Sequence, residues 1–235
     1  MSNLHKESEV FNTLLQKFLS LPKTNSNPTF MEICQMTGDR FEERCSQILR
    51  FFLTPNEAHG LRGLFLSSLL EVVAREDLSF SHNGTKVITE EATEDRKFID
   101  ITVVADDFVI AIENKIGASL YNPLNSYVSH IKKTYSTRSN HIFVVLSARP
   151  ITDSAEIGKI KRYDYYYVNY RTLFDTIKKN LGTYAIDADQ SYLAFLFDFI
   201  RTIENRYTTN NMELKRFFLR EPTPNKLVKS RVSKI

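Results

Sequence analysis

The chain has 235 residues, of which 42% are hydrophobic and 25% are charged, with only 7 Gly and 7 Pro. This composition excludes a disordered chain and is typical of a globular protein with a good-sized core. The formal net charge of +3 is too small to indicate a polyanion partner by itself.

No linker rich in Pro, Gly or Ser divides the sequence, so we expect a single domain over residues 1–235. The first ten residues are polar and mixed in charge, and no apolar run is long enough to span a bilayer. We therefore expect a cytoplasmic protein without a membrane partner. Cys34 and Cys45 lack the spacing of a disulfide framework or a zinc site, so we expect both to be reduced and packed.

Helical periodicity dominates the first third of the chain. The apolar residues of Val10 to Leu19 predict an N-terminal helix, within residues 1–21, that ends before Pro22. Asp39 is the predicted N-cap of a second helix that stops at Pro55. A third helix is expected from about Leu61 to Val73.

From Lys86 the apolar period changes to that of strands. Three strands are predicted as an antiparallel meander: Val87 to Glu91, Phe98 to Val104 and Phe108 to Ile116. The later expected elements are a helix at Leu124 to Tyr135, strands at His141 to Leu146 and Tyr165 to Tyr170, and helices at Leu173 to Lys179 and Tyr192 to Ile203. This order predicts an α/β (α+β) fold with a mixed central β-sheet flanked by helices, without internal repeats.

Two acids and a lysine interrupt an otherwise apolar hairpin. With Asp106-Asp107 as the turn, Ala105 pairs with Phe108 and Asp100 falls opposite Glu113. The same register predicts a mostly aliphatic inward face from the pairs Val103–Ile110, Ile101–Ile112 and Ile99–Asn114.

Directly opposed residues on paired strands have their Cβ atoms about 5 Å apart, so two carboxylates held there repel each other. Lys115 returns to the face of Glu113 by the two-residue period of a strand, and a divalent cation would supply the remaining positive charge. A cation held there suits phosphodiester hydrolysis, because it can bind a phosphate oxygen and lower the pKa of a bound water. Lys115 would orient that water, neutralise developing charge or act as a base. The alternative is a salt-bridge cluster on the solvent face of the hairpin.

One strand carries Ile99-Asp100 and the next carries Glu113-Asn114-Lys115. These residues resemble the core motif of the PD-(D/E)xK nuclease superfamily, an acid on one strand and Glu-x-Lys on the next, with Ile99 in place of the usual Pro. The resemblance implies a restriction-endonuclease-like fold and catalytic roles for the acids and the lysine. It also implies a Mg²⁺- or Mn²⁺-dependent endonuclease or exonuclease whose partner is nucleic acid, DNA more than RNA.

The helix before the sheet extends the resemblance. Glu42-x3-Ser46-x2-Leu49, followed by Pro55-Asn56-x2-His59-Gly60, is similar to the N-terminal pattern of one prokaryotic branch of the superfamily. A Glu on this helix commonly completes the metal site there, so the resemblance implies a metal and catalytic role for Glu42 beside Asp100 and Glu113. If Glu42 does not have this role, the adjacent Glu43 is the alternative candidate. From the residues alone, an equally weighted interpretation of Glu42 is a first-turn Glu that is favoured by the helix dipole and has no role in a metal site.

Two positions keep open roles. His59 is either a substrate-side element or a structural residue ahead of a helix. Many relatives carry a Gln in the helix after Glu-x-Lys, whereas this chain has Pro123 near that position. Asn122 and Asn125 are the candidates to replace that Gln.

The main alternative to an enzyme is a catalytically inactive nucleic-acid-binding module on a nuclease fold. Such a module would use the basic C-terminal extension, about residues 206–235. This extension is either a phosphate-contacting arm or a solvated terminus, and the composition slightly favours the solvated terminus. Four further basic residues would contribute to this module: Lys132, Lys133, Lys161 and Arg162. A third hypothesis is an interaction protein, and it rests on a Tyr-rich segment: Tyr163, Tyr165, Tyr166, Tyr167 and Tyr170. Tyrosines at strand spacing pack against helices or form a homodimer face more often than they stack on bases.

Overall fold

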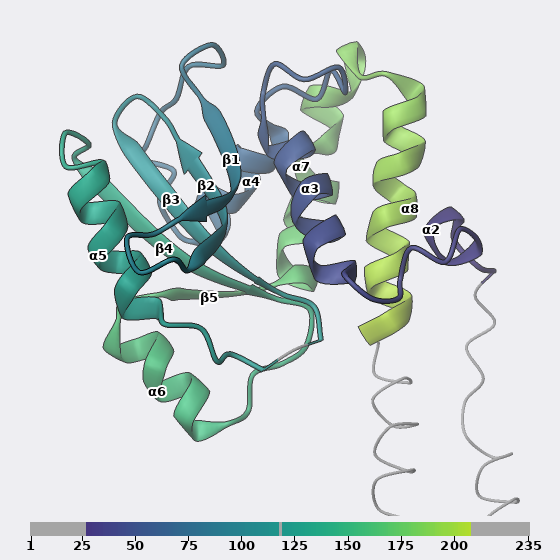
Figure 1. The fold of residues 1–235 in the computed structure, drawn as a ribbon. Coiled ribbons are helices and arrows are strands. Elements are labelled where there is room, and N and C mark those ends of the chain that lie inside the picture. Colours follow the sequence, from purple (N-terminus) through teal and green to yellow (C-terminus); the bar gives the residue numbers. More distant parts are fainter. Residues whose placement is uncertain (1–26, 118, 208–235) are drawn as a thin grey trace, which may run out of the picture. The chain divides into compact units, whose positions relative to one another are not determined.

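The computed structural model describes residues 27–117 and 119–207 (Figure 1). Thr29–Ile203 forms one compact unit. A second unit joins Met1–Pro28 to Glu204–Ile235, and only residues 27–28 and 204–207 of it are described. The predicted N-terminal helix and nearly all of the basic extension lie outside the described residues. The expectation of a single domain over the whole chain therefore stays a prediction.

Five strands form one mixed sheet in the order β1-β2-β3-β4-β5 (Figure 1). Their bounds are β1 (Lys86–Ala92), β2 (Phe98–Val104), β3 (Phe108–Lys115), β4 (Asn140–Ser147) and β5 (Tyr166–Asn169). The first three strands are the predicted antiparallel meander, whereas β4 and β5 continue the sheet in parallel. Parallel neighbours need long crossovers, which are provided by α5 (Leu124–Thr134) and α6 (Ser154–Arg162).

Helices cover both faces of the sheet, as predicted. On one face, α5 and α6 bury a cluster that includes Leu124, Ile131 and Ile160 against strand residues such as Phe143 and Val145. The other face is covered by α3 (Phe41–Leu53), α4 (Leu64–Val72) and α7 (Tyr170–Tyr184) (Figure 1). Within the described residues, the remaining elements are α2 (Phe30–Ile33), η1 (Ala185–Asp187) and α8 (Gln190–Tyr207). The chain has the α/β fold expected of a restriction-endonuclease-like domain.

Several predicted boundaries change in the structure. The N-cap of α3 is Arg40 and not Asp39, and it has a positive φ of 61° with no side-chain cap. The helix still ends before Pro55, because proline disfavours a helical residue ahead of it. The predicted Tyr165–Tyr170 strand is shorter, since the Asn169 side chain accepts a hydrogen bond from the Arg171 N–H and caps α7. Helices α2 and α6 were not predicted.

The hairpin register is the predicted one as far as the ladder extends. The Ala105 N–H donates to the Phe108 carbonyl over 2.9 Å, which closes the turn. The ladder pairs Val103 with Ile110 and ends at Ile101 opposite Ile112. Beyond this point the prediction for Ile99 is wrong: it packs in the cluster that α5 covers and does not face Asn114.

The two cysteines differ in burial. Cys45 is buried as expected, but Cys34 is exposed, so its predicted packing is wrong. Cys34 is the C-cap of the four-residue helix α2, which is too short to bury a full face. Among the residues that the structure describes, no helix has the length and apolar character needed to cross a membrane.

Candidate active site

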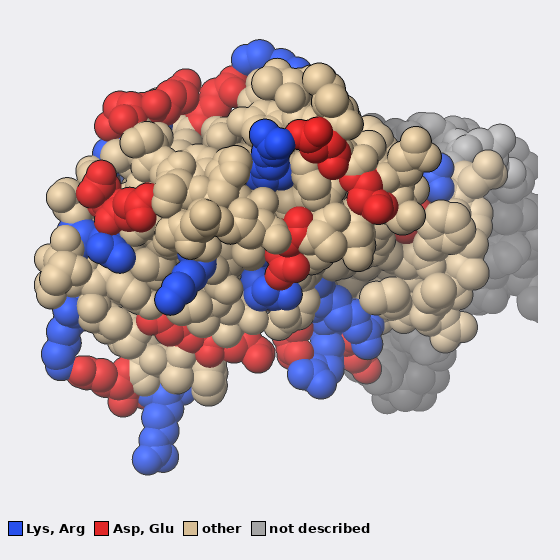
Figure 2. All heavy atoms as spheres, turned by 90° about the horizontal axis from the view of Figure 1, so that it is seen from above, with Lys and Arg blue, Asp and Glu red and all other residues tan. Residues whose placement is uncertain are grey.

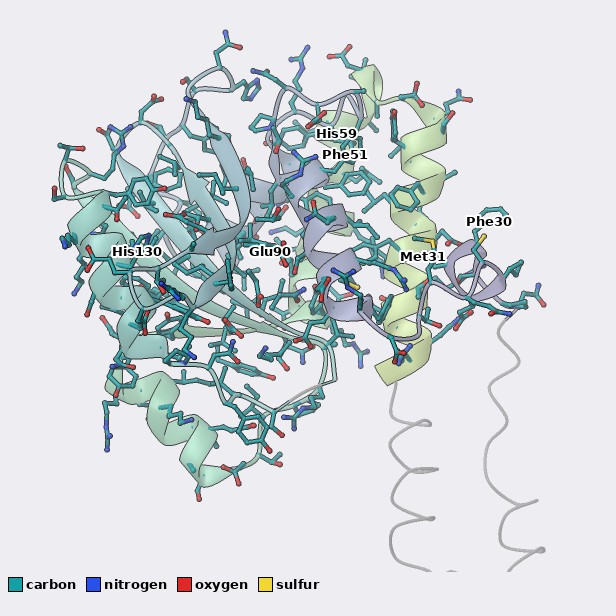
Figure 3. All side chains as sticks on the ribbon, viewed as in Figure 1. Phe30, Met31, Phe51, His59, Glu90 and His130 are labelled. Carbon is teal, nitrogen blue, oxygen red and sulfur yellow. The ribbon has the colours of Figure 1, made fainter. Side chains whose placement is uncertain are left out.

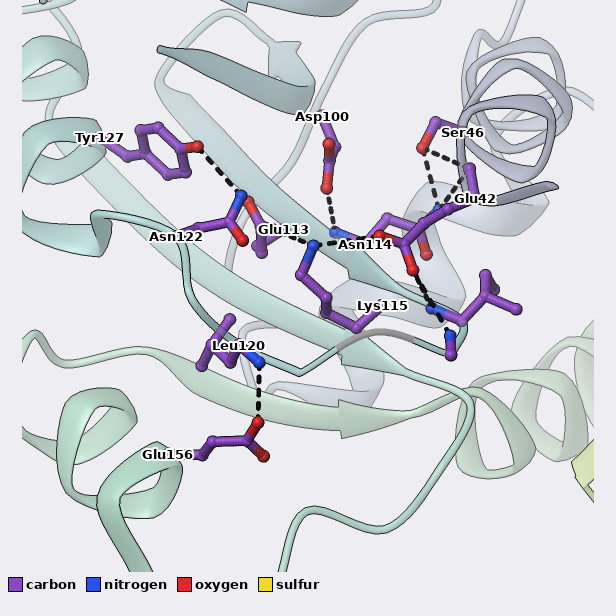
Figure 4. A network of polar contacts seen from close by, with 12 residues as sticks. Glu42, Ser46, Asp100, Glu113, Asn114, Lys115, Leu120, Asn122, Tyr127 and Glu156 are labelled. Carbon is purple, nitrogen blue, oxygen red and sulfur yellow. Dashed lines mark hydrogen bonds and ion pairs between the residues drawn. The ribbon is translucent and has the colours of Figure 1, made fainter. Parts of the chain in front are cut away.

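The end of β3 carries a buried acid and a buried lysine (Figure 4). The Glu113 side chain is 0% exposed and that of Lys115 is 8% exposed, and 2.7 Å separates Oε1 of the acid from Nζ of the lysine. The alternative of a salt-bridge cluster on a solvent face is therefore wrong. Both faces of β3 are covered by helices, so the polar residues of this strand lie within the protein.

Asp100 is tied to the same strand through its carboxylate. Its Oδ2 accepts the backbone N–H of Asn114 over 2.7 Å, just beyond the last ladder pair of β2 and β3, Ile101 and Ile112. The charge of Asp100 acts on Glu113, so the structure brings these two predicted residues into one electrostatic environment.

Glu42 reaches the site from the first turn of α3, as the resemblance implies. Its Oε1 lies 3.1 Å from Nζ of Lys115, and its Oε2 accepts the backbone N–H groups of Ile116 at 2.7 Å and Gly117 at 3.4 Å. The alternative candidate Glu43 does not reach Lys115, since its carboxylate is bonded to Arg40. Glu42 therefore fastens the helix to the end of β3.

Asn114, the middle residue of Glu-Asn-Lys, anchors the site to the surrounding helices. It is fully buried, and its side-chain amide donates to the Ser46 hydroxyl over 2.9 Å and to the Glu42 carbonyl over 3.2 Å. Its amide oxygen accepts from the Tyr170 hydroxyl over 2.8 Å. The sequence signal for this role is a polar side chain within an apolar strand, because buried polar groups require partners.

Burial shifts the ionisation of all three central groups. It raises the pKa of Asp100 to about 6, although Lys115 and the Asn114 N–H oppose the shift. Burial, followed by the charge of Asp100, raises the pKa of Glu113 to about 8. Burial alone would lower the pKa of Lys115, but the charges of Glu113 and Glu42 outweigh it and raise that pKa above its usual range. Lys115 therefore stays protonated at neutral pH.

The Glu113 carboxylate fits a cation. Among the described residues, neither of its oxygens has a hydrogen-bond partner, and the contact with Lys115 is an ion pair without hydrogen-bond geometry. Buried carboxylate oxygens without partners are costly unless a cation or donor satisfies them. Within the described ranges, no three His, Cys, Asp or Glu side chains converge as a complete metal cluster. Mg²⁺ does not need such a cluster, because it is usually bound by one or two carboxylates and keeps several waters.

The structure separates the two candidates for the missing Gln. Asn122 donates to the Tyr127 hydroxyl over 3.3 Å (Figure 4). Asn125, in contrast, is exposed. Burial raises the pKa of Tyr127, and the charges of Glu113 and Asp100 raise it further, which places this hydroxyl within their field. Tyr127 is not among the site residues predicted from the sequence. Its only signal is a Tyr one helical turn after Pro123.

His59 belongs to the core and not to the acidic site. Its ring is fully buried beside Phe51 and Phe52, and Figure 3 shows His59 and Phe51 next to each other at the end of α3. Nδ1 accepts the Leu61 N–H over 2.9 Å, so Nε2 carries the proton and donates to the Thr54 carbonyl over 3.1 Å. Burial lowers the pKa of His59, which favours this neutral form. Of the two open roles, the structural one fits these contacts.

A hollow of about 260 Å³ adjoins the site on the side of β1. Asp100 and Ser46 line it together with residues that the sequence analysis did not select as site residues: Arg40, Arg44, Gln47 and Glu90. Figure 3 shows Glu90 at the side of the sheet that faces α3.

The chain is similar to a known protein family. A family model described as the PD-(D/E)XK nuclease superfamily matches residues 31–211, which include the whole site. No curated protein and no solved structure matches the chain. With more than half of its residues matched to the family, the chain belongs to the PD-(D/E)XK nuclease superfamily.

Proposed function

We propose that this chain is a metal-dependent nuclease that hydrolyses phosphodiester bonds, with DNA as the expected substrate and Mg²⁺ or Mn²⁺ as the cofactor. The observation that carries the proposal is the buried Glu113 carboxylate, which lies beside Lys115 with no hydrogen bond to either oxygen from the described residues. Membership of a nuclease family supports a nucleic-acid substrate. The choice of DNA, the metal and the distinction between endonuclease and exonuclease are expectations.

Asp100 and Glu113 are the proposed metal ligands. A divalent cation bound there supplies Lewis-acid stabilisation of the charge that develops on the phosphate. Deprotonation of both acids is required for this role. Without a cation, the raised pKa values mean that Asp100 gives up its proton near pH 6 and Glu113 only near pH 8.

Glu42 has two proposed roles that can be separated. Both of its oxygens have partners, so it first holds Lys115 and the N–H groups at the end of β3. The role of third metal ligand, which the resemblance implies, requires Glu42 to exchange these partners. Loss of Glu42 should therefore change catalysis more than the affinity for the metal.

Lys115 is proposed as an electrostatic catalyst. The acids around it keep it protonated, so it has no free lone pair with which to act as a base at neutral pH. Its ammonium, held by Glu113 and Glu42, can neutralise charge on the phosphate or orient the attacking water. Removal of one such preorganised group typically lowers kcat by about 10²- to 10³-fold.

A cleavage assay tests the proposal. Labelled single-stranded, duplex and branched DNA and an RNA of the same sequence are incubated with the wild type, Asp100→Asn, Glu113→Gln and Lys115→Ala in Mg²⁺ or Mn²⁺. The matched control is Glu94→Gln, an exposed acid paired with Lys133. We expect cleavage by the wild type and the control only, and loss of cleavage in EDTA. Cleavage that persists unchanged in Lys115→Ala would contradict the mechanism.

The same nucleic acids distinguish the enzyme from the inactive binding module. If the wild type retards these nucleic acids on a gel but never cuts them, the binding module replaces the enzyme. Titration calorimetry of Mn²⁺ into the wild type and Asp100→Ala gives an independent answer. Equal and negligible heats would remove the metal site from the proposal.

A further inference from the structure

A polar stripe runs along α3 beside Glu42. Its members recur at the spacing i, i+3, i+4, i+7, which places them on one face of the helix. They are Arg40, Glu43, Arg44 and Gln47, and all four line the hollow. The opposite wall consists of Glu90 from β1 and Asp100 from β2, so the hollow leads from the helix to a proposed metal ligand.

Arg44 has a charge that no carboxylate neutralises among the residues that the structure describes. Its side chain is half-buried, and Nη1 donates to the Met36 carbonyl over 2.7 Å. This bond fixes the direction of the guanidinium and uses one of its five N–H donors. The remaining donors can bind an anion in the hollow.

Arg40 is more exposed and is held more weakly. It sits at the N-cap of α3 and donates through Nε to the Glu43 carboxylate over 2.7 Å. Both side chains of this pair are exposed, so solvent screens it and a stronger anion can displace the carboxylate.

The hollow does not attract an anion by charge alone, because three acids line it against two arginines. A cation at Asp100 would reverse this balance, so the inference rests on the proposed metal-dependent function. Figure 2 shows basic and acidic side chains interspersed over one face of the protein. On that face, specific contacts and not a broad basic surface must position a nucleic acid.

We propose that Arg44, with help from Arg40, binds the phosphate that neighbours the scissile phosphate on the substrate strand. The guanidinium presents its N–H donors as a planar fork that matches two phosphate oxygens. The hollow is where such a phosphate can lie while the next one reaches Asp100 and Glu113. The role is one of substrate positioning, since Arg44 does not contact the two proposed metal ligands in the structure.

The test is the binding of fluorescein-labelled single-stranded and duplex DNA, measured by fluorescence anisotropy at several salt concentrations. Ca²⁺ replaces Mg²⁺, and a gel confirms that the DNA stays intact. We expect Arg44→Ala to weaken binding about tenfold and to reduce the slope of log Kd against log salt by about one, as for the loss of one phosphate contact. Arg44→Lys, which keeps the charge but not the fork, should fall between Arg44→Ala and the wild type.

The matched control is Arg171→Ala, which removes the same charge from α7, where the side chain is 81% exposed. We expect its Kd to stay within about twofold of the wild type. Arg40→Ala serves as a second variant in case Arg44→Ala fails to fold, because Arg40 is exposed. Equal binding by Arg44→Ala, Arg40→Ala and Arg171→Ala would overturn the inference, as would a wild type that binds neither DNA.

Failure of the inference can be told apart from failure of the proposed function. The binding measurement does not depend on cleavage, whereas the proposed function is judged by metal-dependent cutting with the same protein preparation. A wild type that cuts DNA, together with an Arg44→Ala variant of unchanged Kd and salt slope, would reject the phosphate site alone.

Discussion

The Glu113 carboxylate lies 2.7 Å from the Lys115 ammonium, yet neither of its oxygens has a hydrogen-bond partner in the described part of the chain. The lysine offsets only part of the charge there, because Asp100 and Glu42 add negative charge around the same group. Deprotonated Glu113 is thus electrostatically unfavourable in the metal-free site. This is the state that a bound cation would stabilise.

Glu113→Gln should stabilise the metal-free protein at high pH while it abolishes cleavage. The pKa of Glu113 in the folded protein, about 8, lies above the ordinary value of 4.5, so the fold favours the protonated acid. Its stabilising contribution is present below about pH 4.5 and is lost as the pH rises through 8. The glutamine stays neutral and keeps that contribution. Thermal unfolding in EDTA should give a higher Tm for the variant at pH 8.5 and a smaller difference at pH 5.

The control for this measurement is Glu94→Gln, whose acid is exposed. Its Tm should follow the wild type at both pH values. A Glu113→Gln protein that is less stable than the wild type at pH 8.5 would show that the ion pair with Lys115 outweighs the burial of the charge.

Affinity for Mn²⁺ should rise with pH. A cation and protons compete for Asp100 and Glu113, whose pKa values are raised to about 6 and about 8. Between pH 6 and pH 8, displacement of one proton predicts an increase in apparent affinity of about tenfold for each pH unit. Titration calorimetry over this range measures it. For Glu42→Gln we expect a nearly unchanged affinity for Mn²⁺ together with slower cleavage. An affinity for Mn²⁺ as low as that of Asp100→Asn would show that Glu42 is a metal ligand.

Lys115→Met should lower kcat by about 10²- to 10³-fold, because it removes a preorganised positive charge. The methionine keeps much of the buried stem, so the fold should survive. Since Lys115 is held protonated, raising the pH from 7 to 9 should not produce a lysine-dependent increase in the wild-type rate. A rate that rises over this range in the wild type, and not in Lys115→Met, would indicate a base.

Asn114→Ala should be strongly destabilising. It removes the amide that joins β3 to Ser46 of α3 and Tyr170 of α7, and it leaves buried groups without partners. The expected loss in the free energy of unfolding is about 2–4 kcal/mol. The matched control is Asn125→Ala, an exposed amide, for which urea denaturation should show a change within about 0.5 kcal/mol. Similar losses for both would mean that the network does not stabilise the fold.

Two glycines should respond to alanine in opposite directions. Gly60 has φ of +67°, and a Cβ there would lie 2.2 Å from the Asp187 carbonyl oxygen, so Gly60→Ala requires the backbone to move. Gly182 lies in α7, and a Cβ added there would meet no atom within 4 Å, so Gly182→Ala should stabilise by about 0.5–1 kcal/mol. Thermal unfolding of both variants checks the prediction. A tolerated Gly60→Ala would show that this loop can relax.

The sequence determined more of the fold than of the side-chain environment. Strand and helix periods predicted the meander and the later strands, because repeated apolar spacing reflects which face of an element is buried. Short elements such as α2 carry too few residues for a period to be visible. The N-cap of α3 was also beyond reach, since Arg40 takes up its positive φ without a capping side chain.

For the site, the hairpin turn and the two-residue strand period predicted that Asp100, Glu113 and Lys115 lie close together. In the structure Glu113 contacts Lys115 and Asp100 accepts the Asn114 N–H, although the β2–β3 ladder ends before Asp100. Tertiary structure decided what surrounds them. Ser46, Asn114 and Tyr170 meet from three elements that are distant in the sequence, and Glu113 and Lys115 beside Asn114 are buried. The sequence thus specified the chemical groups of the candidate site. The pKa values of these groups were set only by the packing of α3, α5 and α7 on the sheet. Burial shifts a pKa, and burial depends on neighbours that local sequence spacing does not encode.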